Sequence, residues 1–218
     1  MAILSNQELQ NLREDYRMAE LDEAAVSKDP IQQFSHWLSE ALEAQLPEPN
    51  AMVLSTVDAR QRPSARVVLL KGVEGQSFVF FTNYESRKGR EIDQNPYGAL
   101  TFNWLELQRQ VRITGKVERI DEAASTAYFQ SRPKGSQIGA WASDQSQVLK
   151  SRDTLEKKYT ELEKKYATAD LLPKPRYWGG YRLLPDQIEF WQGRSSRLHD
   201  RLQFDLIDGH WQLSRLYP

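Results

Sequence analysis

The chain has no cysteine among its 218 residues, so disulfides, thiolate metal sites and cysteine nucleophiles are all excluded. It has no apolar run near the roughly 20 residues that a membrane-spanning helix needs. The N-terminal stretch "MAILSNQELQNLREDYR" is polar and lacks a secretory hydrophobic region. From these absences we expect a soluble, cytoplasmic protein.

The chain also has almost no net charge. Its 29 basic and 30 acidic residues leave −1 at pH 7. No global field therefore favours nucleic acid or an anionic membrane, and the basic residues form no long stripe. We expect neither nucleic acid nor membrane as a partner, and any anion site must be local.

Several catalytic signatures are missing as well. The sequence contains no GxSxG elbow, no phosphate-binding P-loop and no GxGxxG fingerprint, which argues against serine hydrolases, P-loop enzymes and Rossmann-type dinucleotide folds. His36 and His210 lack metal-ligand spacing and nearby partners, so we expect no metal site.

The pattern of apolar residues predicts a mainly β (α+β) fold. β-branched and aromatic runs such as "AMVLSTV", "SARVVLLKGV" and "SFVFFTN" are separated by turn segments. Further strands are expected at 97–104, 108–120, 177–185 and 187–193, and a hairpin at 204–216 has Asp208-Gly209 as a type I′ turn. Helices are expected at 5–21, from an Asp29 cap and Pro30 onward, within 84–96, at 121–131 and at 151–169. This spacing indicates one antiparallel β-barrel with surrounding helices, over residues 1–218 as a single domain.

Two clusters of cations fall on one strand and one helix. In "SARVVLLKG", the alternation of side chains along a strand places Arg66 and Lys71 on opposite faces. An alternative explanation is that both residues lie at strand ends and extend their side chains into water. In "NYESRKGRE", Ser86 suits a helix cap, so Arg87 and Lys88 fall in the first turn, where cations oppose the helix dipole. This end either holds a phosphate or is a solvated basic helix end.

Two more clusters lie further along. Tyr128, Arg132 and Ser136 can donate hydrogen bonds to an anion, and the first two share a helix face, but ordinary polar decoration explains them equally. The stretch "EFWQGRSSRLHDR" gathers Arg194, Arg197, His199 and Arg201 beside a tryptophan. Arginine is the residue type that grips phosphate bidentately, so this neutral chain can bind one or two small phosphorylated molecules.

At this point "RVVLLKG", "SRKGREIDQNP", "RQVRITGKVERI", "SRPKGSQIGAWASDQS" and "FWQGRSSRLHDR" resemble the pyridoxamine 5′-phosphate oxidases. The resemblance runs in order from "LREDY" at Leu12 to the C-terminus. It implies an FMN-binding split β-barrel and a homodimer in which both subunits line each flavin site. It also implies that residues 1–20 form a mobile segment that folds over the occupied site and that the strands of 178–218 complete that site.

The resemblance assigns roles to the clusters. It implies that the FMN phosphate is held by Arg66, Arg87 and Lys88, and that the flavin is lined by Val67, Val68, Leu69, Leu70, Lys71, Phe81, Thr82 and Gln110. From the partner subunit the flavin would be reached by Gln145, Ser146, Trp191 and Arg201. The substrate phosphate would be held by Lys71, Tyr128, Arg132 and Ser136, and the rest of the substrate by Arg13, Tyr16, Arg197, Leu198 and His199. Arg197 and His199 would be the catalytic residues over the pyridine ring.

The implied activity is oxidation of pyridoxamine and pyridoxine 5′-phosphates to pyridoxal 5′-phosphate by dioxygen, with hydrogen peroxide as product, in vitamin B6 biosynthesis and salvage. Two alternatives stay open. One is a split-barrel flavin or haem carrier without oxidase activity, and the other is a split-barrel enzyme that reduces another substrate with a different flavin. The carrier would share the barrel and the flavin-phosphate residues but lack the substrate set, which is present here as Lys71, Tyr128, Arg132, Ser136, Arg197 and His199.

Overall fold

The computed structural model describes residues 5–12 and 14–218, and the chain divides into two compact units. The central unit comprises Asn50–Thr101 and Ile113–Asp186, and the terminal unit comprises Met1–Pro49, Phe102–Arg112 and Gln187–Pro218. That residues 1–218 act as a single domain stays a prediction. Within the described ranges, no helix combines the length and apolarity that crossing a membrane requires.

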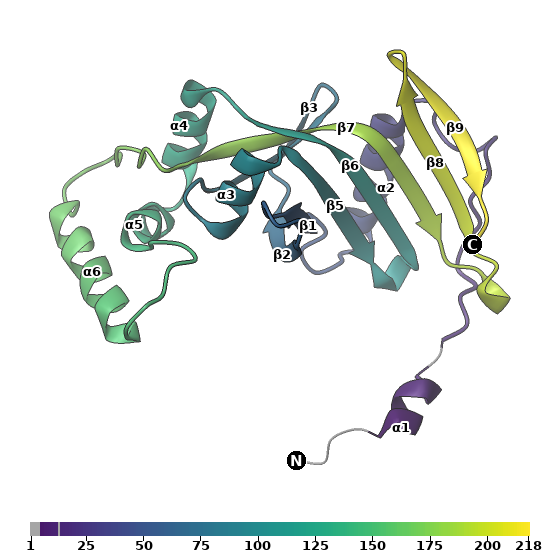
Figure 1. Cartoon of the computed structure of the whole chain (residues 1–218), viewed down its shortest axis with the longest axis horizontal. Helices are drawn as coiled ribbons and strands as arrows, with labels where there is room; N and C mark the ends of the chain where they lie inside the picture. Colours follow the sequence, from purple (N-terminus) through teal and green to yellow (C-terminus); the bar gives the residue numbers. More distant parts are fainter. Residues whose placement is uncertain (1–4, 13) are drawn as a thin grey trace. The chain divides into compact units, whose positions relative to one another are not determined.

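The central unit is built on an antiparallel sheet. Its strands are β1 (Ala51–Val57), β2 (Pro63–Leu69), β3 (Gly72–Glu74), β4 (Ser77–Asn83) and parts of β5 (Tyr97–Trp104), β6 (Arg109–Arg119) and β7 (Trp178–Gln192). They follow the order β2-β1-β5-β6-β7-β4-β3 (Figure 1). Along β1, Met52, Leu54 and Thr56 are buried and alternate with half-buried residues, as the period of a strand requires. The strands predicted at 51–57, 77–83, 97–104 and 108–120 are confirmed, but the run predicted at 64–73 divides into β2 and β3, with Leu70 and Lys71 between them.

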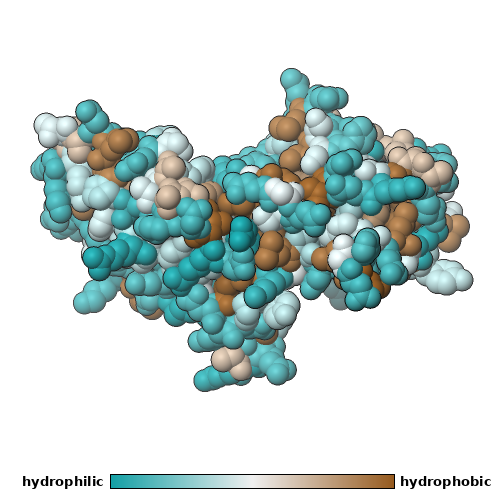
Figure 2. Space-filling view, turned by 90° about the horizontal axis from the view of Figure 1, so that it is seen from above, coloured by the Kyte–Doolittle hydropathy of each residue, from teal (hydrophilic) through white to brown (hydrophobic). Residues whose placement is uncertain are grey.

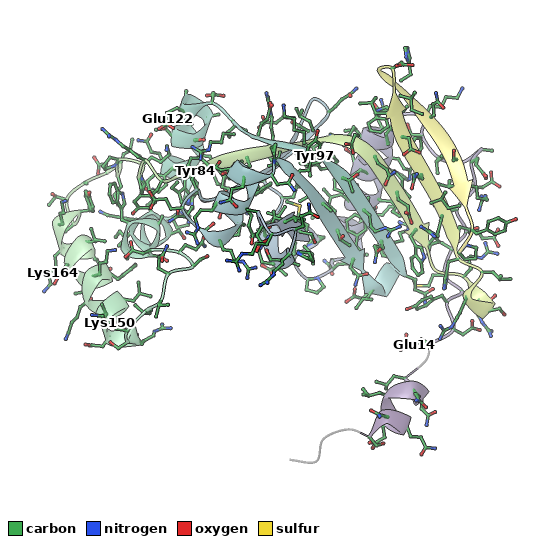
Figure 3. The ribbon with its side chains drawn as sticks, viewed as in Figure 1. Glu14, Tyr84, Tyr97, Glu122, Lys150 and Lys164 are labelled. Atoms are coloured by element: carbon green, nitrogen blue, oxygen red, sulfur yellow. The ribbon has the colours of Figure 1, made fainter. Side chains whose placement is uncertain are left out.

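Four helices belong to the central unit in the described chain, namely α3 (Arg87–Gln94), α4 (Glu122–Ser131), α5 (Lys134–Ala142) and α6 (Arg152–Lys165). α5 was not predicted, because two glycines and several polar residues make its sequence a weak helix former. α5 and α6 lie side by side (Figure 1), and Ile138 and Ala142 are buried. Lys164 projects from the outer side of α6 (Figure 3). Tertiary packing, rather than local propensity, therefore accounts for α5.

The terminal unit contains α1 (Asn6–Asn11), α2 (Pro30–Glu43), β8 (Asp200–Ile207), β9 (His210–Leu216) and the 3₁₀ turns η1 (Leu105–Leu107) and η2 (Ser195–Arg197). Asp29 caps α2 by accepting the Ile31 N–H at 2.8 Å, as predicted. The rings of Phe34 and Trp37 on α2 contact Phe102 at 4.9 Å and Phe190 at 5.2 Å between centroids. These contacts form the aromatic core of this unit.

The β8–β9 hairpin turns at Asp208 and Gly209, whose φ angles are 50° and 78°. Positive φ at both central residues is the requirement of a type I′ turn, so that prediction is confirmed. The face drawn in Figure 2 carries mainly hydrophilic residues with small apolar groups between them. This is expected for units that bury their apolar side chains in their own cores.

Several predicted elements were wrong in extent. The first helix ends at Asn11 rather than near residue 21. Beyond it, the N–H groups of Arg17 and Met18 donate to the Gln108 Oε1 at 3.0 and 3.2 Å, so they are paired outside any helix. The strands predicted at 177–185 and 187–193 are one strand, β7. Pro185 lies between the residues that pair with β4 and those that pair with β8, where its missing N–H interrupts neither ladder.

Gly115 on β6 marks a close approach of two strands. A Cβ built there would lie 2.0 Å from the Leu184 carbonyl oxygen. We expect Gly115→Ala to force β6 and β7 apart and to lower the free energy of unfolding by about 1–3 kcal/mol, measured by urea denaturation. Gly139→Ala on α5 is the matched control, since no atom lies within 4 Å of its built Cβ and alanine favours the helix. Equal stability of Gly115→Ala and the unchanged chain would contradict this account.

Candidate functional site

A pocket of about 660 Å³ lies within the central unit. Its walls come from β2, β4, the start of α3, the helices α4 and α5 with the loop that follows, and the start of β7. Of the residues predicted for the site, it brings together Val67, Val68, Leu69, Lys71, Phe81, Thr82, Lys88, Tyr128, Arg132, Ser136 and Gln145. The clusters that the sequence presents separately are therefore gathered around one cavity.

The charge around this pocket has one sign. Lys71, Lys88 and Arg132 line it, and among the described residues of its lining there is no aspartate or glutamate. A chain that is otherwise neutral thus concentrates three cations on a partly enclosed cavity. Such an arrangement binds anions, because cations at a low-dielectric surface without carboxylates keep their charge available for a ligand.

Lys88 is the most buried of these cations, with 8% of its surface exposed. Its Nζ donates to the Thr82 Oγ1 at 3.2 Å, the Ser86 Oγ at 3.4 Å and the Gln145 Oε1 at 3.3 Å, all of them neutral oxygens. Burial and then the nearby charge of Arg66 lower the pKa of Lys88 to about 8. A solvated helix end therefore does not describe Lys88, and a bound anion would stabilise its charge.

The start of α3 supports the same interpretation. Ser86 caps the helix by accepting the Gly89 N–H at 3.3 Å, as predicted. The first-turn N–H groups of a helix have no acceptor within it and point toward a ligand at that end. Arg87, at the first helical position, is more than half exposed, so only Lys88 enters the cavity.

Beside the pocket, one buried carboxylate holds two arginines. Glu91 is 4% exposed, and its oxygens lie 3.2 Å from the Arg66 Nη2 and 2.8 Å from the Arg87 Nε. The hydroxyls of Thr56 and Ser64 donate to the same carboxylate at 2.5 and 2.6 Å. Arg66 therefore does not reach out to water, and it lies outside the lining of the pocket, whereas Lys71 lies within it.

At a second part of the pocket, the end of α4 and the start of α5 place three predicted phosphate ligands together. Tyr128 lies in the last turns of α4, Arg132 is its C-terminal cap and Ser136 lies in the first turn of α5. The Nη1 of Arg132 is buried and has no hydrogen-bond partner within the described part of the chain. Burial lowers the pKa of Arg132 and raises that of Tyr128. An unpaired guanidinium N–H beside a cavity marks a place for an anionic oxygen.

The terminal unit has its own pocket, of about 510 Å³, lined by Tyr16, Arg197 and His199 among others. The ring of His199 lies 4.6 Å from that of Trp191 and 5.9 Å from that of Tyr16. The backbone N–H of Arg194 donates to the His199 Nδ1 at 3.1 Å. Burial and the charge of Arg197 lower the pKa of His199, which keeps its imidazole neutral at pH 7.

Other predicted site residues lie outside both linings, namely Arg66, Leu70, Arg87, Gln110, Ser146, Trp191, Leu198 and Arg201. Arg201 forms two hydrogen bonds with the buried Glu189, at 2.9 and 3.1 Å. Gln145 contacts Lys88 of its own chain, and its predicted contribution to a partner subunit stays a prediction. Arg13 lies outside the described residues. The roles of all these residues stay predictions.

The residues missed from the sequence include Glu91, which lies beside the pocket, and Trp178, which lines it. Glu91 follows Arg87 by four positions on α3, a spacing that stabilises ion pairs and was available as a signal. Trp178 lines the pocket from the start of β7 but lies far along the chain from every cluster that it joins. No local pattern of the sequence points to it.

Comparison with known proteins gives a consistent set of relatives. Residues 38–166 match the family model described as pyridoxamine 5′-phosphate oxidase, and residues 178–218 match that of a pyridoxine 5′-phosphate oxidase C-terminal dimerisation region. A pyridoxine/pyridoxamine 5′-phosphate oxidase of Paraburkholderia phytofirmans is 55% identical over 96% of this chain and 99% of that protein.

Solved structures agree with these matches. The crystal structure of PhzG from Burkholderia lata in complex with tetrahydrophenazine-1-carboxylic acid has a TM-score of 0.87 at 29% identity, covering 94% of this chain and 100% of that one. A pyridoxamine 5′-phosphate oxidase-related, FMN-binding protein from Nostoc punctiforme has a TM-score of 0.67 at 18% identity, covering 85% and 97%. These likenesses confirm the predicted fold class, an antiparallel split barrel with surrounding helices.

The Glu91 cluster predicts how stability depends on pH. Burial raises the pKa of Glu91, but hydrogen bonds from Ser64, Thr56 and Arg87 outweigh it and lower the pKa to about 2. A depressed pKa stabilises the fold above the ordinary value of 4.5, and this contribution is lost as the pH falls toward 2. It amounts to about 3 kcal/mol.

We expect the chain to lose more stability between pH 5 and about 2 than Glu91→Gln does, since all other carboxylates are shared by both proteins. Urea denaturation at a series of pH values measures the difference. Parallel curves for the two proteins over this range would show that Glu91 carries no such linkage.

Proposed function

The chain belongs to the pyridoxamine 5′-phosphate oxidase family, and we propose that it oxidises pyridoxamine and pyridoxine 5′-phosphates to pyridoxal 5′-phosphate with FMN as its cofactor. Pyridoxamine 5′-phosphate, dioxygen and water give pyridoxal 5′-phosphate, ammonia and hydrogen peroxide; pyridoxine 5′-phosphate and dioxygen give the aldehyde and peroxide. The reaction serves vitamin B6 biosynthesis and salvage. The observation that carries the proposal is the carboxylate-free pocket in which Lys71, Lys88 and Arg132 meet.

The residues around α3 fit the phosphate of FMN. Arg66 and Arg87 pair with one carboxylate, Glu91, while Lys88 donates to neutral oxygens, so the three cations and one acid leave a net charge of about two positive units. A phosphate monoester carries up to two negative charges at neutral pH. The first-turn N–H groups of α3 add donors for its oxygens. Bound FMN would supply the two-electron redox chemistry, which no side chain of this protein can perform.

The substrate phosphate is assigned to the other cationic part of the pocket. Lys71, Arg132, Tyr128 and Ser136 offer two charges and two hydroxyl donors, and the buried Nη1 of Arg132 lacks a partner. Fixing the phosphate at these residues would orient the vitamer and reduce the entropy lost in reaching the reactive arrangement. The two phosphate sites explain why one neutral chain has so many arginine clusters.

Arg197 and His199 would act on the substrate ring. Because the His199 Nδ1 accepts the Arg194 N–H, the neutral imidazole carries its proton on Nε2. His199 would therefore donate a hydrogen bond from Nε2 to the ring oxygen of the vitamer. Arg197 would cover the ring, and Tyr16 of the N-terminal segment would help to close this pocket against water.

The assembly belongs to the proposal as well. Because residues 178–218 match a dimerisation region, we propose a homodimer with FMN at the subunit interface, to which Trp191 and Arg201 contribute. A second candidate follows from the likeness to PhzG, whose solved complex holds a tetrahydrophenazine carboxylic acid. A ligand of that kind has no phosphate, so the cations beside Tyr128 favour the B6 phosphates.

The activity has a direct test. Purified protein with FMN and pyridoxamine 5′-phosphate in air should form pyridoxal 5′-phosphate, seen by its absorbance, together with peroxide. Arg197→Ala should keep FMN bound but reduce turnover by about 100-fold or more, because the ring loses its clamp. The exposed Arg176→Ala serves as control and should retain turnover. Absence of pyridoxal 5′-phosphate would overturn the function; unchanged turnover in Arg197→Ala would overturn the clamp.

FMN binding should depend on the charge of Lys88. Removing this cation in Lys88→Met should weaken FMN about 10- to 100-fold, since a charge-assisted hydrogen bond is lost while the side-chain volume is kept. Because the pKa of Lys88 is about 8, FMN affinity of the unchanged chain should fall as the pH rises above about 8. Lys88→Met should show no such fall.

Fluorescence titration of FMN between pH 6.5 and 9.5 measures both effects. Lys164→Met, on the outer side of α6 (Figure 3), is the matched control and should behave as the unchanged chain. An affinity in Lys88→Met that equals that of the control would remove Lys88 from the FMN site.

A further inference from the structure

Trp178 is part of the central pocket, although no predicted role included it. It is the first residue of β7, where its backbone pairs with Asn83 of β4, and 6% of its surface is exposed. It lines the pocket together with Tyr128 and Arg132. Because Trp178 begins a strand that is paired within the sheet, the backbone that carries its ring is held in place.

The ring of Trp178 belongs to a stack of three nearly parallel aromatic rings. Its centroid lies 5.4 Å from that of Phe81 at an interplanar angle of 13°, and 6.2 Å from that of Tyr128 at 10°. Phe81 and Tyr128 lie closer still, at 3.9 Å and 21°. Phe129 meets Trp178 edge-on at 5.2 Å. The stack therefore fixes the plane of the Tyr128 ring and with it the direction of the hydroxyl.

The guanidinium of Arg132 lies over the same tryptophan. Its Cζ is 4.8 Å from the ring centroid, within the range of a cation–π interaction. Among the described residues no carboxylate acts on Arg132, and its buried Nη1 has no hydrogen-bond partner. An aromatic face thus occupies the place that a carboxylate takes beside Arg66 and Arg201.

This difference has a chemical consequence. A carboxylate beside Arg132 would compete with an anionic ligand for the guanidinium, because both are acceptors of the same donors. The face of an aromatic ring attracts the cation but does not accept the hydrogen bonds that the guanidinium donates in its own plane. The charge and the N–H groups of Arg132 therefore stay available for an anionic ligand. Arg132 is thereby held in place and left unneutralised.

We propose that Trp178 is a positioning residue that holds Arg132 and Tyr128 for the phosphate group of the substrate and so sets the preference for phosphorylated over unphosphorylated vitamers. This inference rests on the proposed function. Trp178 acts through Arg132 and the aromatic stack, and it is not assigned to the chemistry of the ring.

The test measures discrimination rather than turnover. FMN-loaded protein is titrated with pyridoxal 5′-phosphate and with pyridoxal. The ratio is the dissociation constant of pyridoxal divided by that of pyridoxal 5′-phosphate. In Trp178→Leu this ratio should fall about tenfold, the loss expected for one desolvated cation–π contact, while FMN retention is unchanged. Trp178→Phe keeps a smaller and weaker aromatic face, so it should lower the ratio only about two- to threefold.

A purely structural role predicts otherwise. Trp141→Phe removes an indole from the same apolar cluster without touching the pocket lining, and it should leave the ratio unchanged. If Trp178→Leu lowers thermal stability as Trp141→Phe does but keeps the ratio, the inference is wrong. Should Trp178→Leu fail to fold, Trp178→Phe is compared in the unchanged and Arg132→Ala backgrounds.

In that cycle, an effect of Trp178→Phe on the ratio that disappears in Arg132→Ala supports action through Arg132, and an equal effect in both backgrounds contradicts it.

The outcomes also separate the inference from the function on which it rests. If the unchanged chain shows no preference for the phosphorylated vitamer, the proposed function fails; if it shows the preference and Trp178→Leu keeps it, only the inference fails.

Discussion

The central pocket depends on cations that are kept partly out of water without being neutralised. Lys88 is surrounded by neutral oxygens, and Arg132 lies against an aromatic face. Burying charge without a counter-ion destabilises a fold, and proteins keep such groups where a ligand supplies the opposite charge. Lys88 and Arg132 thus provide two separate anchoring positions in one cavity, and the surrounding strands and helices keep these positions apart.

Much of this arrangement was predictable because its signals are local. Caps at Ser86 and Asp29, the alternation along β1 and β2, and the Asp208-Gly209 turn each depend on a few neighbouring residues. The family resemblance likewise depends on short motifs, each made of neighbouring residues, that follow one another in order along the chain. Physical chemistry at short range therefore accounts for most of the strand pattern and for the cation clusters.

What the sequence did not predict depends on contacts far along the chain. Residues 17 and 18, which were predicted to lie in the first helix, instead donate their N–H groups to Gln108, and α5 packs beside α6. Trp178 meets Arg132 across a long stretch of intervening chain. None of these contacts leaves a periodic trace, so pattern alone cannot reveal them.

The shared carboxylate of Glu91 has a consequence for how binding sites of this kind change. Glu91, which lies on α3, interacts with two arginines and two hydroxyls. A substitution of Glu91 would leave all four groups without their shared acceptor, and no single second substitution could compensate for that loss. The aromatic stack beside Arg132 is held by ring packing and a cation–π contact instead, so exchanging one aromatic ring for another there removes no buried hydrogen-bond acceptor. A change of ligand at the Arg132 end of the cavity therefore needs fewer coordinated substitutions than a change at the Lys88 end, beside Glu91.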